Sequence, residues 1–193
     1  MNLKPLVNGI VLFIGLGLAT YSQLDKNSQK ATNTTKSVVI ERNSNQSYEK
    51  WQLSPGSIYD GDTLRVVRGS EELKIRLCGI DAPEKKQELG VEARDHLRSL
   101  VDKGDGTIYV TPVEKDRYGR TVAELYVPLG NRQALFLNSQ MVADGYARHY
   151  EKYSDNCPNQ KGLIIALDVA KQHKLGIWNG NPQPPWDWRK ANK

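Results

Sequence analysis

Three short stretches of the 193-residue sequence combine carboxylates or arginines with residues that favour turns. They read DGDT at positions 60–63, RLCGIDAPE at 76–84 and DRYGR at 116–120. Carboxylates in the first two stretches could hold a hard divalent cation through oxygen. Arginines in the second and third could bind a phosphate group with planar, bidentate donors. The three stretches together predict a site for a cation and a phosphate.

Each stretch also has a purely structural explanation. Asp-Gly-Asp is common in turns, Ala-Pro-Glu can end a strand, and Tyr-Gly-Arg can join the strands of a hairpin. The functional interpretation depends on finding all three in one small domain, in this order and spacing.

The elements around these stretches follow a pattern of short strands and helices. Residues 63–68 and 72–78 alternate apolar with polar side chains, which predicts a hairpin preceded by a short strand at 57–59. A second strand pair is expected at 107–113 and 121–127, and helices at 90–101, 134–145 and 159–175. This order predicts an α+β, mainly β fold: a five-stranded OB-fold barrel with three helices.

The motifs resemble those of the thermonuclease or staphylococcal nuclease-like family. The resemblance covers residues 57–178 and includes KLGIW at 174–178, and the PWDWR tail at 185–189 is similar to exported members. It implies a calcium-dependent nuclease that hydrolyses DNA and RNA with little sequence specificity and leaves 3′-phosphate ends. It gives no sign of a protein partner, and we expect a monomer.

The resemblance also implies roles for individual residues. One Ca²⁺ would be held by the carboxylates of Asp62 and Asp81 and by the backbone carbonyl of Ala82, where the best-known member has threonine. The loop after residue 84 is shorter than in that member. The implied catalytic residues are Arg76, Glu84 as general base, and Arg120.

Three further residues are implied to contact the substrate. Arg117 and Tyr118 would bind phosphate, and Tyr153 would stack on a base. A half-buried surface aromatic is the alternative for Tyr153.

Two other functional classes compete with the enzyme. One is a non-catalytic nucleic-acid-binding OB barrel, and the other is an interaction module tethered to a membrane. Retention of the whole charged set favours the enzyme, because clustered carboxylates are costly without a cation. Net charge does not discriminate: the chain carries +5, but residues 51–193 have 21 Lys and Arg against 19 Asp and Glu, a difference of +2.

The sequence before the domain suggests export. Residues 1–22 contain an apolar run that is short for a bilayer span and predicts a signal peptide or an uncleaved membrane anchor; a buried helix is a third possibility. Residues 23–50 are polar and predict a disordered linker, so the domain is expected at 51–193. We expect a secreted, periplasmic or membrane-anchored protein.

Export would permit a disulfide between the two cysteines, Cys78 and Cys157. The alternative is a buried Cys78 in a strand and an unrelated Cys157 in a loop.

Overall fold

The computed structural model describes residues 38–41, 48–180 and 182–192. All of them belong to one compact unit, Thr35–Lys193; the other unit, Met1–Thr34, lies outside the described residues, as does the predicted signal peptide or anchor. Within the described ranges, no helix combines the length and apolarity needed to cross a membrane.

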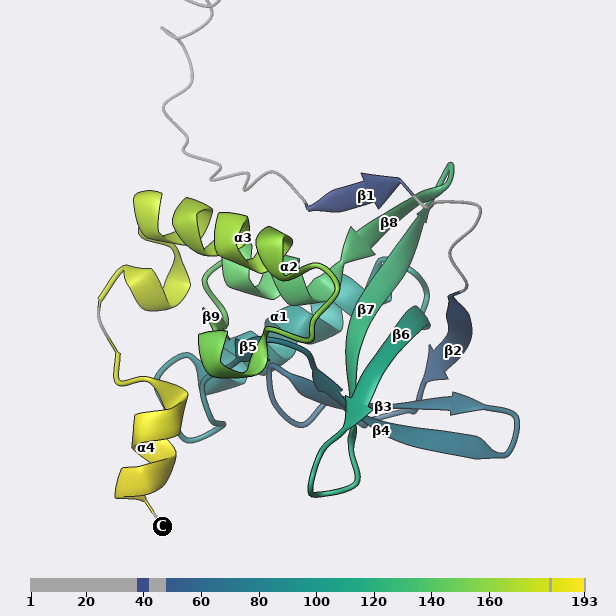
Figure 1. Cartoon of the computed structure of the whole chain (residues 1–193), viewed down its shortest axis with the longest axis horizontal. Coiled ribbons are helices and arrows are strands. Elements are labelled where there is room, and N and C mark those ends of the chain that lie inside the picture. The colour runs from purple at the N-terminus through teal and green to yellow at the C-terminus, as the bar shows by residue number, and fades with distance from the viewer. Residues whose placement is uncertain (1–37, 42–47, 181, 193) are drawn as a thin grey trace, which may run out of the picture. The chain divides into compact units, whose positions relative to one another are not determined.

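Five strands close into a barrel, which confirms the OB-fold prediction. Their order around the barrel is β2-β3-β4-β7-β6, and β6 pairs again with β2 (Figure 1). Four of the five pairings are antiparallel, and the fifth, between β4 and β7, is parallel. The strands are β2 (Glu49–Leu53), β3 (Thr63–Arg68), β4 (Glu71–Leu77), β6 (Thr107–Lys115) and β7 (Thr121–Gly130).

Four shorter strands extend this framework. β8 (Gln133–Phe136) pairs with β7, and β1 (Val39–Glu41) pairs with β8. β5 (Ile80–Asp81) and β9 (Arg148–His149) form a separate two-stranded sheet next to the end of β4. β5 begins the segment that carries three of the predicted site residues, Asp81, Ala82 and Glu84.

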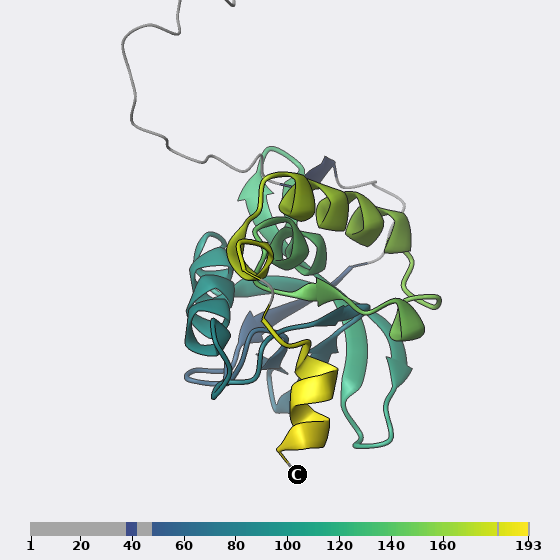
Figure 2. The same ribbon diagram turned by 90° about the vertical axis from the view of Figure 1, so that its left-hand side faces the viewer.

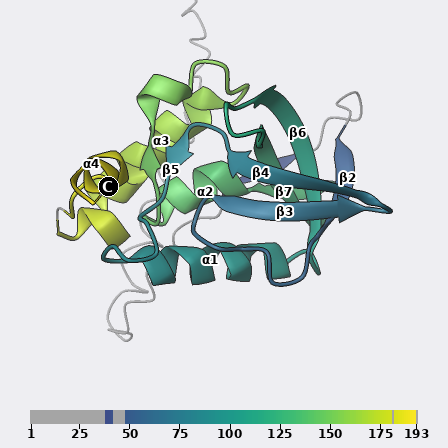
Figure 3. The ribbon, with the colours of Figure 1, turned by 90° about the horizontal axis from the view of Figure 1, so that it is seen from below.

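The helices cover the barrel from two directions. α1 is Gly90–Asp102, α2 is Leu137–Ala143 and α3 is Gln160–Gln172; all seven residues of α2 are buried, and it lies under α3 (Figure 2). α1 runs along the side of β3 and β4 (Figure 3). A fourth helix, α4 (Pro185–Ala191), follows near the C-terminus.

The alternation that predicted the barrel strands is visible in their burial. Leu64 and Val66 of β3 and Ile75 and Leu77 of β4 are completely or almost completely buried. Because side chains of a strand alternate between its two faces, these residues fill the barrel while the intervening polar residues face outward.

The first barrel strand differs from the sequence prediction. Residues 57–59 form no strand; β2 takes that place and begins inside the predicted linker, as does β1. The linker prediction is therefore wrong for residues 39–41 and 48–50. The polar segment contributes Val38 and Tyr48 to the core surface, and Trp51 of β2 is almost fully buried in it. These contacts bury apolar side chains of a segment whose polar composition predicts disorder.

The helices also differ in detail from the prediction. The expected helix at 134–145 is a strand, β8, followed by the short helix α2, because β7 and β8 form a hairpin whose pairing reaches Phe136. The expected helix at 159–175 ends at Gln172. α4 was not predicted.

Cys78 and Cys157 form a disulfide, which settles the alternative left open by the sequence. The bond joins the end of β4 to the loop before α3, across 79 residues. We expect the double substitution Cys78→Ala and Cys157→Ala to lower the free energy of unfolding by about 4–5 kcal/mol, because a long closed loop restricts the unfolded chain. Urea unfolding measures this, with reduced wild-type protein as the control that should match the double variant. A loss below about 1 kcal/mol would contradict the expectation.

Candidate active site

Arg76 occupies the centre of the predicted site. It lies on β4 opposite Thr63 of β3, so the residue before Thr63, Asp62, lies beside it. Its guanidinium forms an ion pair with Asp62 through Nη1 and donates from Nη2 to Asp81 Oδ1 at 2.7 Å and to the Ile80 carbonyl at 2.9 Å. Burial lowers the pKa of Arg76, and the Asp81 carboxylate opposes that shift. One guanidinium therefore bridges the two carboxylates that the sequence predicted as metal ligands.

Asp62 is held by backbone as well as side-chain donors. The Ala82 amide donates to Asp62 Oδ2 at 2.7 Å, and the Thr63 hydroxyl donates to Oδ1 at 3.1 Å. Gly61 allows this approach, since a Cβ there would lie 2.7 Å from the Ala82 Cβ and 2.9 Å from the Ala93 Cβ. The turn and the 80–84 segment thus pack against each other, which brings Asp62, Asp81 and Ala82 together.

Asp81 is fully buried and has two arginine partners. In addition to Arg76, the Arg189 guanidinium donates to both of its oxygens, from Nη1 at 3.1 Å and from Nη2 at 2.7 Å. A buried carboxylate is stable only if it is well paired, and here two guanidiniums supply the pairing.

Glu84 lies at the rim of this cluster, with a side chain that is 33% exposed. Its Oε1 accepts a hydrogen bond from Arg189 Nη1 at 2.7 Å. The chain after Glu84 folds back on it at Gly90, where a Cβ would lie 1.9 Å from the Glu84 carbonyl oxygen. The close packing of this short connection fixes the start of α1 against the site.

Arg120 reaches the site from the other side of the β4–β7 pairing. Val122 of β7 is the register partner of Arg76, and Arg120, which directly precedes β7, lies within electrostatic range of Arg76. Arg120 Nε donates to Asp116 Oδ2 at 2.7 Å, while the backbone amides of Tyr118 and Arg120 both donate to Oδ1 at 2.9 Å. Burial opposes the effect, but these hydrogen bonds lower the pKa of Asp116. Asp116 thereby sets the shape of the loop that carries Arg120.

Asp60 is a further carboxylate at this site that the sequence analysis did not single out. Its Oδ1 accepts from the Asp62 amide at 3.1 Å. Burial raises its pKa, and the charges of Arg76 and Arg120 oppose the rise. Asp60 therefore lies within electrostatic range of both arginines, and its position two residues before Asp62 was the available signal.

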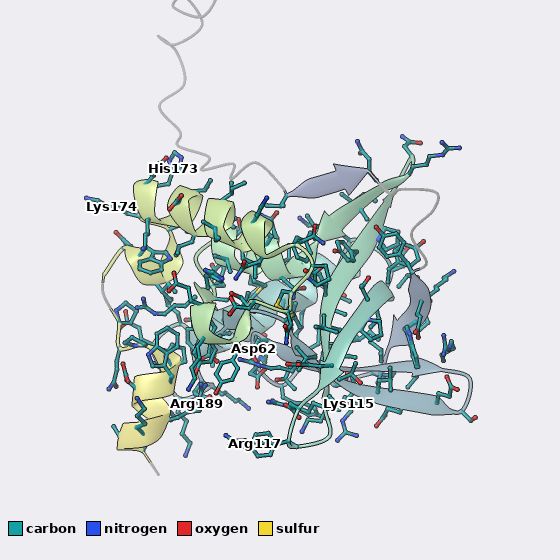
Figure 4. All side chains as sticks on the ribbon, in the orientation of Figure 1. Asp62, Lys115, Arg117, His173, Lys174 and Arg189 are labelled. Carbon is teal, nitrogen blue, oxygen red and sulfur yellow. A yellow bond between two sulfur atoms is a disulfide. The ribbon has the colours of Figure 1, made fainter. Side chains whose placement is uncertain are left out.

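The predicted substrate contacts lie on exposed edges around the cluster. Arg117 lies on the β6–β7 loop (Figure 4), and the ring of Tyr118, 70% exposed, has the guanidiniums of Arg117 and Arg120 at 5.0 and 5.5 Å. Tyr153 is 56% exposed, and its ring lies edge-on to the ring of Tyr150. The Trp186 ring of α4 stacks on the Tyr150 ring, with 4.9 Å between the ring centroids. Tyr153 is thus part of an aromatic group that adjoins α4, on a different segment from Tyr118.

The donor chemistry suits a hard cation, although the carboxylates are arranged around arginines. Asp62 and Asp81 offer oxygen atoms bridged by one guanidinium, with the Ala82 backbone between Asp81 and Glu84. Within the described ranges, no three His, Cys, Asp or Glu side chains are grouped closely enough to form a ready-made metal site. The residues therefore fit an oxygen-coordinated ion such as calcium in type, since calcium accepts carboxylate and carbonyl oxygens in irregular geometry.

Comparison with known proteins finds nucleases. The family model described as staphylococcal nuclease homologue matches residues 74–180. An uncharacterized endonuclease of Escherichia coli O157:H7 is 39% identical over 133 residues, which cover 68% of this chain and 80% of that protein. Micrococcal nuclease of Shigella flexneri is 38% identical over 141 residues, 70% and 79% of the two chains. Staphylococcal-like nuclease CAN1 of Arabidopsis thaliana is 34% identical over 125 residues, 64% and 35% of the two chains.

The OB barrel, with its arginines and carboxylates next to the β4–β7 pairing, agrees with these matches and defines an enzyme of the class that acts on nucleic acids. This chain belongs to the staphylococcal nuclease family, and it is a nuclease, a hydrolase whose substrates are nucleic acids.

Proposed function

We propose that this nuclease hydrolyses phosphodiester bonds in both DNA and RNA with little sequence specificity, and that one Ca²⁺ assists the reaction. The observation that carries the proposal is the position of Arg76 between the buried carboxylates of Asp62 and Asp81, with the charge of Arg120 within electrostatic range of Arg76. Phosphate contacts carry no sequence information, and stacking on an aromatic tolerates every base.

The two arginines would bind the oxygens of the scissile phosphate. Negative charge on those oxygens grows as water adds to phosphorus, so donors fixed in advance lower the barrier. Both arginines are already held by carboxylates, Arg76 by Asp62 and Asp81 and Arg120 by Asp116. Little reorganisation is then needed when the substrate binds.

Glu84 would act as the general base. It takes a proton from the attacking water, the water oxygen bonds to phosphorus, and the bond to the 5′ oxygen breaks. That oxygen takes a proton from solvent water, and Glu84 returns its proton to the solvent. The products would be a 3′-phosphate and a 5′-hydroxyl. Base catalysis of this kind contributes about 10²–10⁴-fold. A bound Ca²⁺ held by Asp62, Asp81 and the Ala82 carbonyl would add positive charge beside the phosphate.

Substrate on either side of the cleaved bond would contact the exposed aromatics. Tyr118 and Arg117 lie on the loop next to Arg120, where they would bind a neighbouring phosphate. Tyr153 would stack on a base at the opposite edge. Each stacked base is worth about 1–3 kcal/mol.

The test is digestion of supercoiled plasmid and of unstructured RNA by the full-length protein in Ca²⁺, in Mg²⁺ and in chelator. Each metal is used at about 1 mM, the upper end of the Kd range of weak calcium sites. We expect both polymers to be cut in Ca²⁺ and neither in chelator. A 5′-labelled oligonucleotide then identifies the ends, since 3′-phosphates block extension until a phosphatase removes them. Cleavage that continues in chelator would eliminate the calcium role.

We also propose that the protein is exported. The Cys78–Cys157 disulfide supports this, because structural disulfides persist mainly in oxidising compartments. Fractionation of cells that express the full chain checks it, and a protein confined to the cytoplasm with reduced cysteines would refute it.

A further inference from the structure

Arg189 of α4 contacts two residues to which the proposed function gives roles, yet it lies beyond the end of the family match at residue 180. It donates to both oxygens of Asp81 and to Oε1 of Glu84, at 2.7 to 3.1 Å. Burial opposes the effect, but the two carboxylates raise the pKa of Arg189, so it is charged at any physiological pH. In this arrangement the guanidinium of Arg189 is the cation that pairs with the carboxylates of Asp81 and Glu84.

A divalent cation would need the same oxygens. Direct coordination places calcium about 2.3–2.6 Å from a carboxylate oxygen. Asp81 is fully buried and already accepts three N–H donors from Arg76 and Arg189. A metal ion at Asp81 would therefore meet a guanidinium at very short range, and two positive groups so close together repel each other strongly.

Arg189 is better placed to leave than Arg76. Arg76 lies near the end of β4, inside the barrel sheet, with a side chain that is only 16% exposed, whereas the Arg189 side chain is 40% exposed. Pro185 is the one fully buried residue of α4.

Among the described residues, three other contacts join this segment to the rest of the domain. Trp186 stacks on Tyr150 at 4.9 Å, Arg148 Nη2 donates to the Pro182 carbonyl at 2.7 Å, and Gln87 Nε2 donates to the Gln183 carbonyl at 2.7 Å. Figure 4 shows Arg189 reaching from α4 toward the region of Asp62. α4 is short, and Pro185 is its one buried residue, so it can shift without disturbing the barrel.

We propose that Arg189 is an internal counter-ion that competes with the divalent cation for Asp81 and Glu84, so that α4 keeps the carboxylates paired until the metal displaces it. While Arg189 is in place, Glu84 is also engaged and cannot accept a proton from water. The metal-free enzyme is thus held inactive by its own C-terminal helix. The inference rests on the proposed calcium role of Asp81.

The experiment is calorimetric titration of the full-length protein with Ca²⁺ and, separately, with Mn²⁺. We expect Arg189→Gln to lower the Kd for the ion at least tenfold, because the competing charge is gone. Trp186→Ala, which removes the stacking on Tyr150, should also lower the Kd for the ion, but by a smaller factor. Lys190→Gln is the matched control: it removes one positive charge from the same helix, where Lys190 pairs with Asp187 at 3.1 Å, and its Kd should stay within about twofold of wild type.

A second measurement follows the helix itself. In chelator, trypsin should cut slowly after Arg189 in the wild type, and saturating Ca²⁺ should speed this cut severalfold, as mass spectrometry of the product reports. An unchanged or weaker affinity in Arg189→Gln, or absence of ion binding by both proteins, overturns the proposal. Plasmid cleavage by the wild type tests the proposed function separately. If the enzyme cleaves without Ca²⁺, the calcium role is wrong, and the ratio of the Mn²⁺ Kd of wild type to that of Arg189→Gln still tests the role of Arg189.

Discussion

Replacing Arg120 with alanine should lower kcat for plasmid cleavage by about 10²–10³-fold while the protein stays folded. Arg120 directly precedes β7, its charge lies within electrostatic range of Arg76, and removal of one donor to a developing oxyanion typically costs this much. Its own ion pair with Asp116 belongs to a loop at the edge of the barrel, so stability should change little. Single-turnover cleavage and circular dichroism measure the two effects.

Arg120→Lys and Arg132→Ala complete this test. Lysine keeps the charge but loses the planar fork, so we expect it to recover only a small part of the rate. Arg132 lies at the exposed turn between β7 and β8, and its loss should leave cleavage unchanged. If Arg120→Ala cut as fast as Arg132→Ala, Arg120 would have no catalytic role.

Arg76→Ala should lower the free energy of unfolding by about 3–5 kcal/mol, measured in chelator. Its removal leaves the buried carboxylates of Asp62 and Asp81 without the cation that bridges them, and breaking a buried ion pair from one side costs this much. Activity should fall by orders of magnitude as well, because the same guanidinium would bind the phosphate.

The matched control for Arg76 is Arg65→Ala on the neighbouring strand. Arg65 pairs with Glu72 at 2.6 Å, but both side chains are substantially exposed, and surface pairs contribute about 0–1 kcal/mol. Urea unfolding of the two variants should therefore differ by several kcal/mol. Equal losses would show that Asp62 and Asp81 do not depend on Arg76.

The barrel strands were the most predictable part of the fold, because a half-buried strand displays its alternation in the sequence. β3 and β6 begin where they were expected, and β4 and β7 match closely. β2 was missed because it follows a polar segment, and its burial depends on a tertiary contact of Trp51 with the core. β8 was mistaken for part of a helix because it continues directly into the apolar residues of α2, and only pairing with β7 distinguishes the two.

For the site, local motifs predicted residue types well and partners poorly. Asp62, Arg76 and Asp81 do lie together, as their motifs suggested. Arg189 could not be predicted from spacing, since it meets Asp81 across 108 residues and Glu84 across 105. Its position depends on how the chain after α3 returns to the barrel, although the Trp-rich run at 186–188, with prolines before it, was a visible sign of a packed segment.

The parallel pairing of β4 with β7 has a consequence for folding. Arg76 lies on β4 and Arg120 directly precedes β7, and the two strands are separated in the chain by β5, α1 and β6. Neither half of the chain alone contains both arginines, so the phosphate-binding site forms only when this long-range pairing has formed. In a refolding experiment, nuclease activity should therefore return later than the circular dichroism signal of the helices. The return of activity would report when the β4–β7 pairing closes the barrel.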